Sequence, residues 1–368
     1  MLDGDPILTR FTHTHLLQVC VLSVAVLLSS RCCLAQNCPN SGAVTINAAN
    51  EETLDSQYQP YPTGAPGVLK RYRFVPPGDW PPNKTFPTVL MVPPNVFKND
   101  MITDDGEMHE RHASYDLQFA GFLVFQVETR LAPPGSLPDQ QSGDSGYAPE
   151  QTDDLKRQIL AAINDSQCDG EIFLVGGSAG GTLALWCALD AASTVTGWDE
   201  TARAHIKAVV SLSGPSQFCD WTNPGNIPPD ALTDFEHDLE NYVHLPYSTE
   251  PPCDPNCDLE AVNCPLDEAS PAWLVSHGAT SNPPAFMLYA TDGDPVPNAQ
   301  AGDMFQALMD QYGTTFDVQL WIMTYQYTSP YNHAFKYWPA KNDAVGSDGK
   351  CVHEEVIAFL ESHESITH

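Results

Sequence analysis

A serine between paired glycines stands at the centre of the segment 176–181, Gly-Gly-Ser-Ala-Gly-Gly. An apolar run at 172–175 precedes it and a helix-like apolar run at 182–189 follows it. The segment therefore predicts a strand, a sharp turn and a helix, with Ser178 at the apex. Glycines suit such a turn, because strand and helix come too close there for a side chain. The turn exposes the Ser178 hydroxyl at a helix N-terminus, where backbone N–H groups can hold an oxyanion. The motif alone also fits a glycine-rich turn that buries a serine.

A serine hydroxyl is a poor nucleophile unless a base lies within hydrogen-bond reach and a carboxylate orients that base. Asp294 follows the apolar strand expected at 285–289, and His333 follows the strand expected at 318–323. Each residue alone also suits an ordinary turn or a solvated loop. Together they stand in the order serine, acid, histidine, each partner in a loop after a strand, which is the order of α/β-hydrolase sheets. The sequence thus predicts a catalytic triad of Ser178, His333 and Asp294.

Apolar strands alternate with helical segments of ten to fifteen residues, which predicts an α/β protein with a mostly parallel sheet and helices on both faces. In such sheets reactive groups gather at the carboxyl ends of the strands. The interval of about 215–284 breaks the alternation and predicts a lid or cap over the site. We expect strands at 69–75, 88–92, 122–127, 172–175, 208–212, 285–289 and 318–323, and helices at 109–120, 149–163, 182–189, 299–311 and 352–362.

Length and composition favour one catalytic domain over residues 69–368, because 368 residues with 42% hydrophobic side chains can bury a large core. Acidic residues number 47 and basic residues 16, a net charge of −31. Phosphates would be repelled by this charge, so nucleic acid and anionic membrane surfaces are excluded as partners.

An apolar run at 16–30, followed by small residues up to Ala35, predicts a signal peptide over 1–35 and a secreted or periplasmic protein. The run is too short to span a bilayer comfortably, so we expect no stable membrane association after cleavage. Asp3 and Asp5 are atypical of a signal peptide, which leaves an uncleaved anchor open. Residues 36–68 are polar and rich in turns, and form an N-terminal extension.

Cleavage after Ala35 would remove three of the eleven cysteines and leave eight, an even number in a compartment where disulfide bonds persist. Cys187 lies in the expected helix after the serine turn and is predicted to be a buried, unpaired side chain. Disulfide bonds are expected in a second group, for which three pairings, and a zinc site, remain open. This group comprises Cys219, Cys253, Cys257 and Cys264.

Six segments carry a family resemblance: Thr-Arg-Leu-Ala-Pro at 129–133, Gly-Ser-Ala-Gly-Gly at 177–181, Ser-Leu-Ser-Gly-Pro at 211–215, Glu-Ala-Ser-Pro at 268–271, Asp-Pro-Val-Pro at 294–297 and Asn-His-Ala-Phe at 332–335. Through them the chain, from about residue 69 to the C-terminus, resembles α/β-hydrolase-fold serine esterases of the carboxylesterase and acetyl-xylan or feruloyl esterase-like group. The resemblance implies Ser178 as nucleophile, His333 as general base and then acid, and Asp294 as its orienting carboxylate, with Asp292 as the alternative acid. It implies no cofactor and no metal, and a small-molecule or polysaccharide-linked ester as substrate.

The chain departs from this family after the strand expected at 88–92. There the family commonly has a His-Gly-Gly loop that completes the oxyanion hole, whereas this chain has Pro-Pro-Asn-Val-Phe at 93–97. Proline has no N–H to donate. We expect one donor at Ala179, the residue after the serine, and a second at Asn95 or Val96 in a remodelled oxyanion hole.

Two other functions fit part of the pattern. A serine peptidase of the prolyl-oligopeptidase type shares the serine turn and the triad order, but such enzymes usually carry a long N-terminal propeller. Fewer than a hundred residues precede the strand at 88–92, which favours an esterase. A non-catalytic binding protein on a hydrolase scaffold would account for the missing His-Gly-Gly loop.

Overall fold

Contacts divide the chain into two units, Met1–Gln36 and Asn37–His368, and all residues described here belong to the second unit. The predicted signal peptide, Asn95 and the four clustered cysteines lie outside the described residues. In the described part, no helix has the length and apolar character needed to cross a membrane. The computed structural model describes residues 51–53, 70–94, 106–129, 148–190, 193–218, 239, 242–243, 265–292, 294–324 and 333–365.

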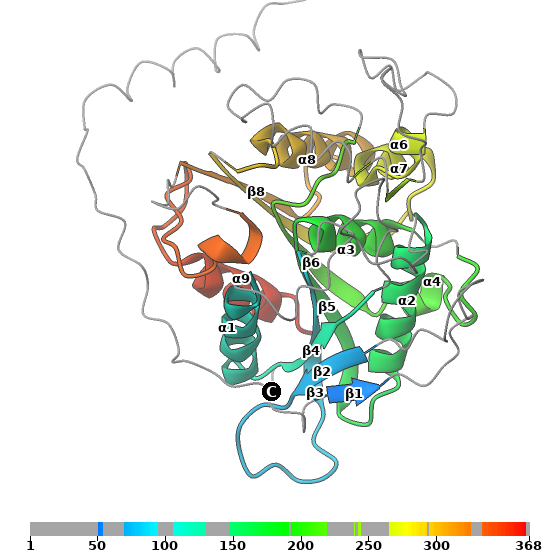
Figure 1. Cartoon of the computed structure of the whole chain (residues 1–368), viewed down its shortest axis with the longest axis vertical. Coiled ribbons are helices and arrows are strands. Elements are labelled where there is room, and N and C mark those ends of the chain that lie inside the picture. Colours follow the sequence, from blue (N-terminus) through cyan, green and yellow to red (C-terminus); the bar gives the residue numbers. More distant parts are fainter. Residues whose placement is uncertain are drawn as a thin grey trace, which may run out of the picture. The chain divides into compact units, whose positions relative to one another are not determined.

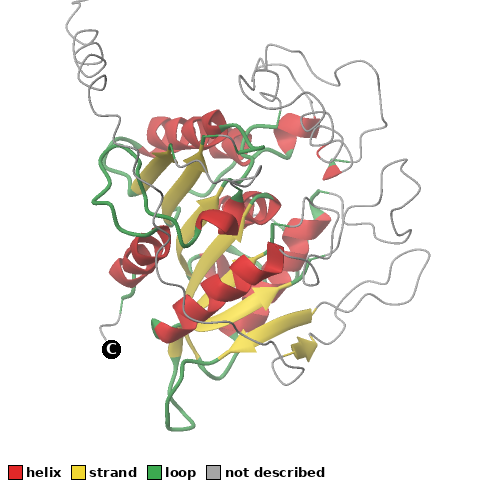
Figure 2. Cartoon of the chain, turned by 60° about the vertical axis from the view of Figure 1, so that its left-hand side comes forward, coloured by secondary structure: helices red, strands yellow, loops and turns green. Residues whose placement is uncertain are grey.

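The described strands form one sheet of eight strands in the order β1-β2-β4-β3-β5-β6-β7-β8 (Figures 1 and 2). β1 and β2 pair antiparallel, β2 pairs antiparallel with β4, and all pairs from β4 to β8 are parallel. The carboxyl ends of six parallel strands therefore meet at one edge. The strands are β1 Glu51–Thr53, β2 Lys70–Phe74, β3 Phe86–Val92, β4 Leu123–Val127, β5 Cys168–Gly177, β6 Ile206–Leu212, β7 Ala285–Thr291 and β8 Val318–Met323.

The central strands are mostly apolar because both faces of the sheet are covered. β3, β4 and β7 are buried at every position. Successive residues point to opposite faces, so Leu90 and Leu174 join one core cluster while Val89 and Phe173 join the other. The expected two-faced sheet is thus confirmed.

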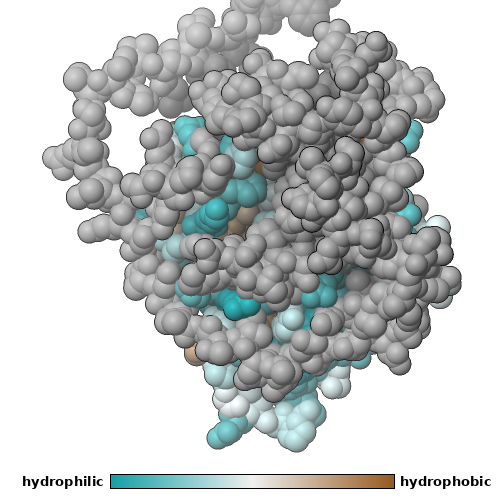
Figure 3. All heavy atoms as spheres, viewed as in Figure 1, coloured by the Kyte–Doolittle hydropathy of each residue, from teal (hydrophilic) through white to brown (hydrophobic). Residues whose placement is uncertain are grey.

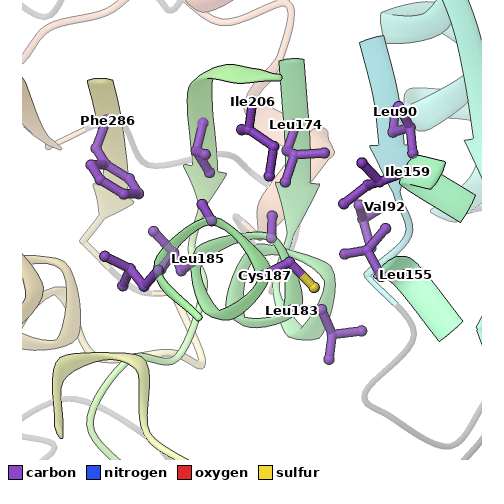
Figure 4. Close-up of a cluster of buried hydrophobic side chains, with 14 of the residues drawn as sticks. Leu90, Val92, Leu155, Ile159, Leu174, Leu183, Leu185, Cys187, Ile206 and Phe286 are labelled. Atoms are coloured by element: carbon purple, nitrogen blue, oxygen red, sulfur yellow. The ribbon is translucent and has the colours of Figure 1, made fainter. Parts of the chain in front are cut away.

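Two groups of helices cover the two faces. α1, the 3-10 helix η3 and α9 contribute to one cluster, and α2, α3, α7 and α8 to the other. Figure 4 shows Leu183, Leu185 and Cys187 of α3 packed against strand residues such as Leu174 and Phe286. The helices are α1 Gly106–Phe119, α2 Glu150–Ile163, α3 Ala179–Leu189, α4 Glu200–Arg203, α6 Pro265–Glu268, α7 Pro271–His277, α8 Asn298–Tyr312, η3 Ala334–Tyr337 and α9 Val352–Ser362.

All seven strands and five helices expected from the sequence are present, with ends moved by a few residues. Short elements were missed, namely β1, α4, α6, α7 and η3. Most of the predicted lid, 219–264, lies outside the described residues, so the lid stays a prediction. Its last part forms α6 and α7, and α7 packs against α3 and α8. Cys187 is buried and free as expected, and so is Cys168.

The turn between β2 and β3 is an exposed connection at the lower end of Figure 1. Residues 77–83 are exposed, and this turn forms the hydrophilic lower tip of the space-filling view (Figure 3). It lies at the amino end of β3, whereas the functional residues expected from the sequence follow the carboxyl ends of the strands.

A buried ion pair joins α2 to the end of α3. Lys156 is 1% exposed, and its Nζ lies 2.7 Å from Asp190 Oδ2 and 3.6 Å from Asp153 Oδ1. The ammonium group also lies 5.8 Å from the ring centroid of Trp198. A lysine removed from water in this way depends on its carboxylate partners for stability.

Acidic side chains surround Glu364 at the C-terminal end of α9. Burial, and next the negative charges of Glu361, Glu171 and Asp169, together raise the pKa of this carboxyl to about 7. The backbone N–H of Ser365 donates to both carboxylate oxygens of Glu171, at 3.0 and 3.1 Å.

Candidate active site

Ser178 stands at the junction of β5 and α3, in the sharp turn predicted from the sequence. Its backbone is in the left-handed region, with φ 49°, and α3 begins at the next residue. A Cβ placed on Gly176 would overlap the carbonyl of Gly180, and a Cβ on Gly180 would overlap the carbonyl of Val92. The glycines are therefore required by the close approach of strand and helix.

The Ser178 hydroxyl is buried, contrary to the expectation that the turn would expose it. The residue is 1% exposed, and no hydrogen-bond partner of Oγ occurs in the described part of the chain. Its backbone N–H donates to the Leu212 carbonyl at 2.8 Å, which fixes the turn against the end of β6. Buried hydroxyls normally have partners, so an unpaired one at a strained turn marks a functional site.

Asp294 and His333 are brought together from the ends of β7 and β8, as the sequence predicted. His333 Nδ1 lies 2.8 Å from Asp294 Oδ1. The Asp294 side chain is fully buried, whereas the His333 side chain is 18% exposed. An ionised carboxylate only accepts, so Nδ1 carries the proton and donates it, and Nε2 remains free to take a proton from a nucleophile.

Three donors converge on the Asp294 carboxylate. Besides His333, the Val296 backbone N–H donates to Oδ1 at 2.7 Å, and the Ser213 hydroxyl donates to Oδ2. The alternative acid, Asp292, accepts instead from Asn298 Nδ2 at 3.0 Å. The structure therefore pairs His333 with Asp294.

The turn that carries His333 packs directly on the serine turn. A Cβ placed on Gly177 would lie 2.9 Å from the Ala334 Cβ and 2.9 Å from the Phe335 ring. η3 thus covers the residue just before Ser178. No hydrogen bond joins Ser178 Oγ to His333. Such bonds commonly tighten only when substrate binds.

Backbone strain is concentrated at this site. Among the described residues, the non-glycine positions with positive φ are Ser178 at 49°, Ser213 at 56° and Ala334 at 52°. One is the turn serine, one donates to Asp294, and one directly follows His333. Strained residues persist where their surroundings hold them in place, and they cluster at functional sites.

One of the two predicted oxyanion donors lies in the described region. Ala179 is the first residue of α3 and is buried, and the N–H groups of the first helical turn have no partner within the helix. Asn95 and Val96 lie outside the described residues, and the second donor stays a prediction. β3 ends beside the serine turn, because Gly180 packs against the carbonyls of Val92 and Pro93.

Buried polar side chains fix the segment that follows β6. Gln300 Oε1 accepts from the backbone N–H groups of Ser216 at 2.9 Å and Gln217 at 2.7 Å. Ser270 Oγ accepts from the Phe218 N–H at 2.8 Å. Sequence reasoning missed these roles, because each bond joins residues more than fifty positions apart.

Sequence reasoning also missed Ser213 and Tyr337, which extend the contacts of Asp294. Tyr337 OH lies 2.9 Å from Ser213 Oγ. Burial, and next the negative charge of Asp294, raise the pKa of Tyr337 well above its ordinary value, so it remains protonated. Ser213 belongs to the segment 211–215 that resembles the esterase family, and Tyr337 to the aromatic stretch around His333, but neither signal indicated a role.

Among the described residues, no group of three or more His, Cys, Asp or Glu side chains is arranged so that it could hold a metal ion. The described site chemistry consists of a hydroxyl, an imidazole and a carboxylate.

No protein-family model matches the sequence, and no curated protein matches it significantly. Solved structures do match. Esterase B from Lactobacillus rhamnosis has 18% identity and a TM-score of 0.52, with 85% of this chain and 84% of that chain covered. The thermophilic esterase Est2 from Thermogutta terrifontis, with propionate bound, has 13% identity and a TM-score of 0.52, with 85% and 93% covered. A truncated carbohydrate esterase from gut microbiota has 15% identity and a TM-score of 0.50, with 78% and 90% covered. Together with the strand order and the serine turn, these likenesses identify the fold of the chain as the α/β-hydrolase fold that the sequence predicted.

Proposed function

We propose that the protein is a serine esterase that hydrolyses carboxylic esters through Ser178, His333 and Asp294. The observation that carries this proposal is the 2.8 Å hydrogen bond from His333 Nδ1 to a fully buried Asp294, in a turn that packs on the serine turn. A neutral imidazole with Nε2 unprotonated is the base that a serine nucleophile needs.

The reaction follows two acyl-transfer steps. Ser178 Oγ attacks the ester carbonyl carbon while His333 Nε2 takes the hydroxyl proton, and the carbonyl electron pair moves onto oxygen. The Ala179 N–H donates to that oxyanion at the N-terminus of α3. The intermediate collapses, the bond to the alcohol breaks, and His333 returns the proton to the leaving alcohol. Water then attacks the acyl-enzyme by the same route and releases the acid.

The proposed mechanism requires only that the substrate has an ester carbonyl group. The identity of its acyl and alcohol groups is proposed from the comparisons with solved structures. The matched structures are named as an esterase, a thermophilic esterase bound to propionate and a carbohydrate esterase. We infer a short acyl chain on a small or sugar alcohol. Hydrophobic pockets separate neighbouring chain lengths by only about 10–200-fold per methylene, so we expect broad acyl specificity.

Hydrolysis of p-nitrophenyl acetate and butyrate by the purified protein tests the proposal. Wild type should hydrolyse both, and Ser178→Ala should lose at least about 10³-fold in kcat, because the acyl-enzyme cannot form. Ser114→Ala is the matched control. Ser114 is fully buried in α1, and its Oγ also lacks a partner in the described part of the chain, but it is remote in sequence from the serine turn. Equal rates in wild type and Ser178→Ala would refute an esterase at this site.

The two rival functions predict different outcomes in the same experiment. A serine peptidase would cleave peptide p-nitroanilides faster than the esters, and a non-catalytic binding protein would give no rate that depends on Ser178. A panel of acetylated, feruloylated and short-chain esters then identifies the acyl preference.

We also propose that the mature protein is secreted, with cleavage after Ala35 and disulfide bonds among the remaining cysteines. The apolar run at 16–30 and the even cysteine number support this. Intact-mass measurement of secreted material should show the loss of 1–35, and retention of these residues on soluble secreted protein would contradict it.

A further inference from the structure

A chain of hydrogen bonds continues from Asp294 into the protein through two buried hydroxyls. The Ser213 hydroxyl contacts Asp294 Oδ2, and Tyr337 OH lies 2.9 Å from Ser213 Oγ. The three residues are buried, with exposed fractions between 1% and 4%. The carboxylate can only accept, so Ser213 must donate to it, and Tyr337 must then donate to Ser213.

Ser213 occupies a fixed place between the serine turn and the acid. It directly follows β6, and its backbone N–H donates to the Tyr289 carbonyl of β7 at 3.0 Å. The preceding residue, Leu212, accepts the N–H of Ser178. Ser213 has a positive φ of 56°, which differs from the backbone conformation of a strand, and its hydroxyl donates to the carboxylate of Asp294 after β7.

Two residues of one short segment, His333 and Tyr337, act on the two carboxylate oxygens of Asp294. His333 donates to Oδ1, and Tyr337, four residues later at the end of η3, acts on Oδ2 through Ser213. His333 and Tyr337 belong to the same turn, so the direct contact at Oδ1 and the contact through Ser213 at Oδ2 together set the orientation of the carboxylate relative to the imidazole ring.

We propose that Ser213 and Tyr337 are positioning residues that hold Asp294 in the orientation in which it stabilises His333 during acyl transfer. This inference rests on the proposed esterase function. When His333 takes the proton of the nucleophile, its positive charge is stabilised by Oδ1 only if the carboxylate keeps its plane. The Ser213 hydroxyl donates its only proton to Oδ2, and Tyr337 donates to the Ser213 oxygen, which holds that hydroxyl in place.

The size of each effect follows from the hydrogen bond that is lost. Ser213→Ala removes a bond to a charged group and should lower kcat by about 10–100-fold. Tyr337→Phe removes a neutral bond one step further away and should lower kcat by about fivefold. KM should stay unchanged in both variants, because neither side chain is inferred to touch the substrate. In the double variant, the loss should equal that of Ser213→Ala alone, since Tyr337 acts only through Ser213.

Tyr289→Phe provides the matched control for Tyr337→Phe. Tyr289 is equally buried, and its hydroxyl also donates toward a carboxylate, Glu355 Oε2, at 2.6 Å. Its ring lies 6.3 Å from that of Tyr337, so both variants disturb the same core cluster. Tyr289→Phe loses a bond to a carboxylate and should lose at least as much stability in urea unfolding as Tyr337→Phe, while it keeps the wild-type kcat.

Steady-state kinetics on p-nitrophenyl butyrate with the full chain, together with urea midpoints, decides the proposal. A loss of kcat in Tyr337→Phe but not in Tyr289→Phe, at equal KM and with a stability loss in Tyr289→Phe that is at least as large, supports it. Equal kcat in the two variants, or additive losses in the double variant, overturns it while leaving the esterase in place. If wild type shows no hydrolysis that depends on Ser178, the proposed function itself fails.

Discussion

Replacing Gly177 by alanine tests how the His333 turn is held against the serine turn. A methyl group at this position would lie 2.9 Å from the Ala334 Cβ and 2.9 Å from two carbon atoms of the Phe335 ring. Ala334 already has a strained backbone, with φ 52°, and both neighbours are buried. The turn therefore has little room to relax except by moving away from the serine as a unit.

The required movement can be worked out from the contact distance. Carbon atoms pack at about 3.5–4.0 Å, so η3 must withdraw by about 0.6–1 Å from its present place. His333 directly precedes this element and moves with it. A displacement of about 1 Å between reacting groups costs about 10² in rate. Overpacking of this kind also costs about 1–3 kcal/mol of stability.

The assay is hydrolysis of p-nitrophenyl butyrate at a temperature where urea titration shows every variant folded. Gly177→Ala should lose about 10²-fold in kcat with little change in KM. Gly302→Ala is the matched control, because a Cβ at that position in α8 meets nothing within 4 Å. It should keep full activity and gain about 1 kcal/mol in stability. A wild-type kcat for folded Gly177→Ala would refute the inferred contact between the two turns.

Four further variants test buried and clustered charges and the supports of the site by urea unfolding. In the folded state the pKa of Glu364 is raised from 4.5 to about 7, so the folded protein resists the ionisation of this carboxyl. The free energy of unfolding therefore falls as the pH rises from about 4.5 to 7. Glu364→Gln should gain about 1 kcal/mol at pH 8, allowing for its partial exposure, and nothing at pH 4, and a gain equal at both would contradict this. Lys156→Met should lose about 3–5 kcal/mol by leaving the Asp190 carboxylate without its buried partner, and Asp190→Leu in the same chain should restore much of it. Gln300→Ala should lose about 2–4 kcal/mol, because two backbone N–H groups lose their acceptor, and a neutral result would contradict that role.

The fold could be predicted because its signals are local. β8 and α9 have the predicted bounds, since an apolar run or a helical period defines each of them. The carboxyl end of β5 and the start of α3 extend further than predicted, because the glycines of the serine turn belong to these elements, although glycine disfavours strands and helices elsewhere. β5 also begins earlier, at Cys168, where the polar residues Asp169 and Glu171 interrupt the apolar pattern. η3 was missed because a single turn of helix has no period to detect.

The candidate site could be predicted only in part, for the same physical reason. The order of Ser178, Asp294 and His333 is visible along the chain, and the strand before each one indicates a common edge of the sheet. Contacts made across 81 and 124 positions are not visible, so Ser213 and Tyr337 carried no signal for their roles. The burial of the Ser178 hydroxyl was likewise missed, because burial depends on contacts between segments that lie far apart in the sequence.

Labelling with a fluorophosphonate probe, followed by peptide mass spectrometry, tests the central claim most directly, because the probe reacts only with a serine whose hydroxyl is activated. The account predicts an adduct on the peptide that contains Ser178, formed at least about 10³-fold more slowly in His333→Ala. No adduct on Ser178 in folded wild-type protein, or equal labelling of wild type and His333→Ala, would contradict it.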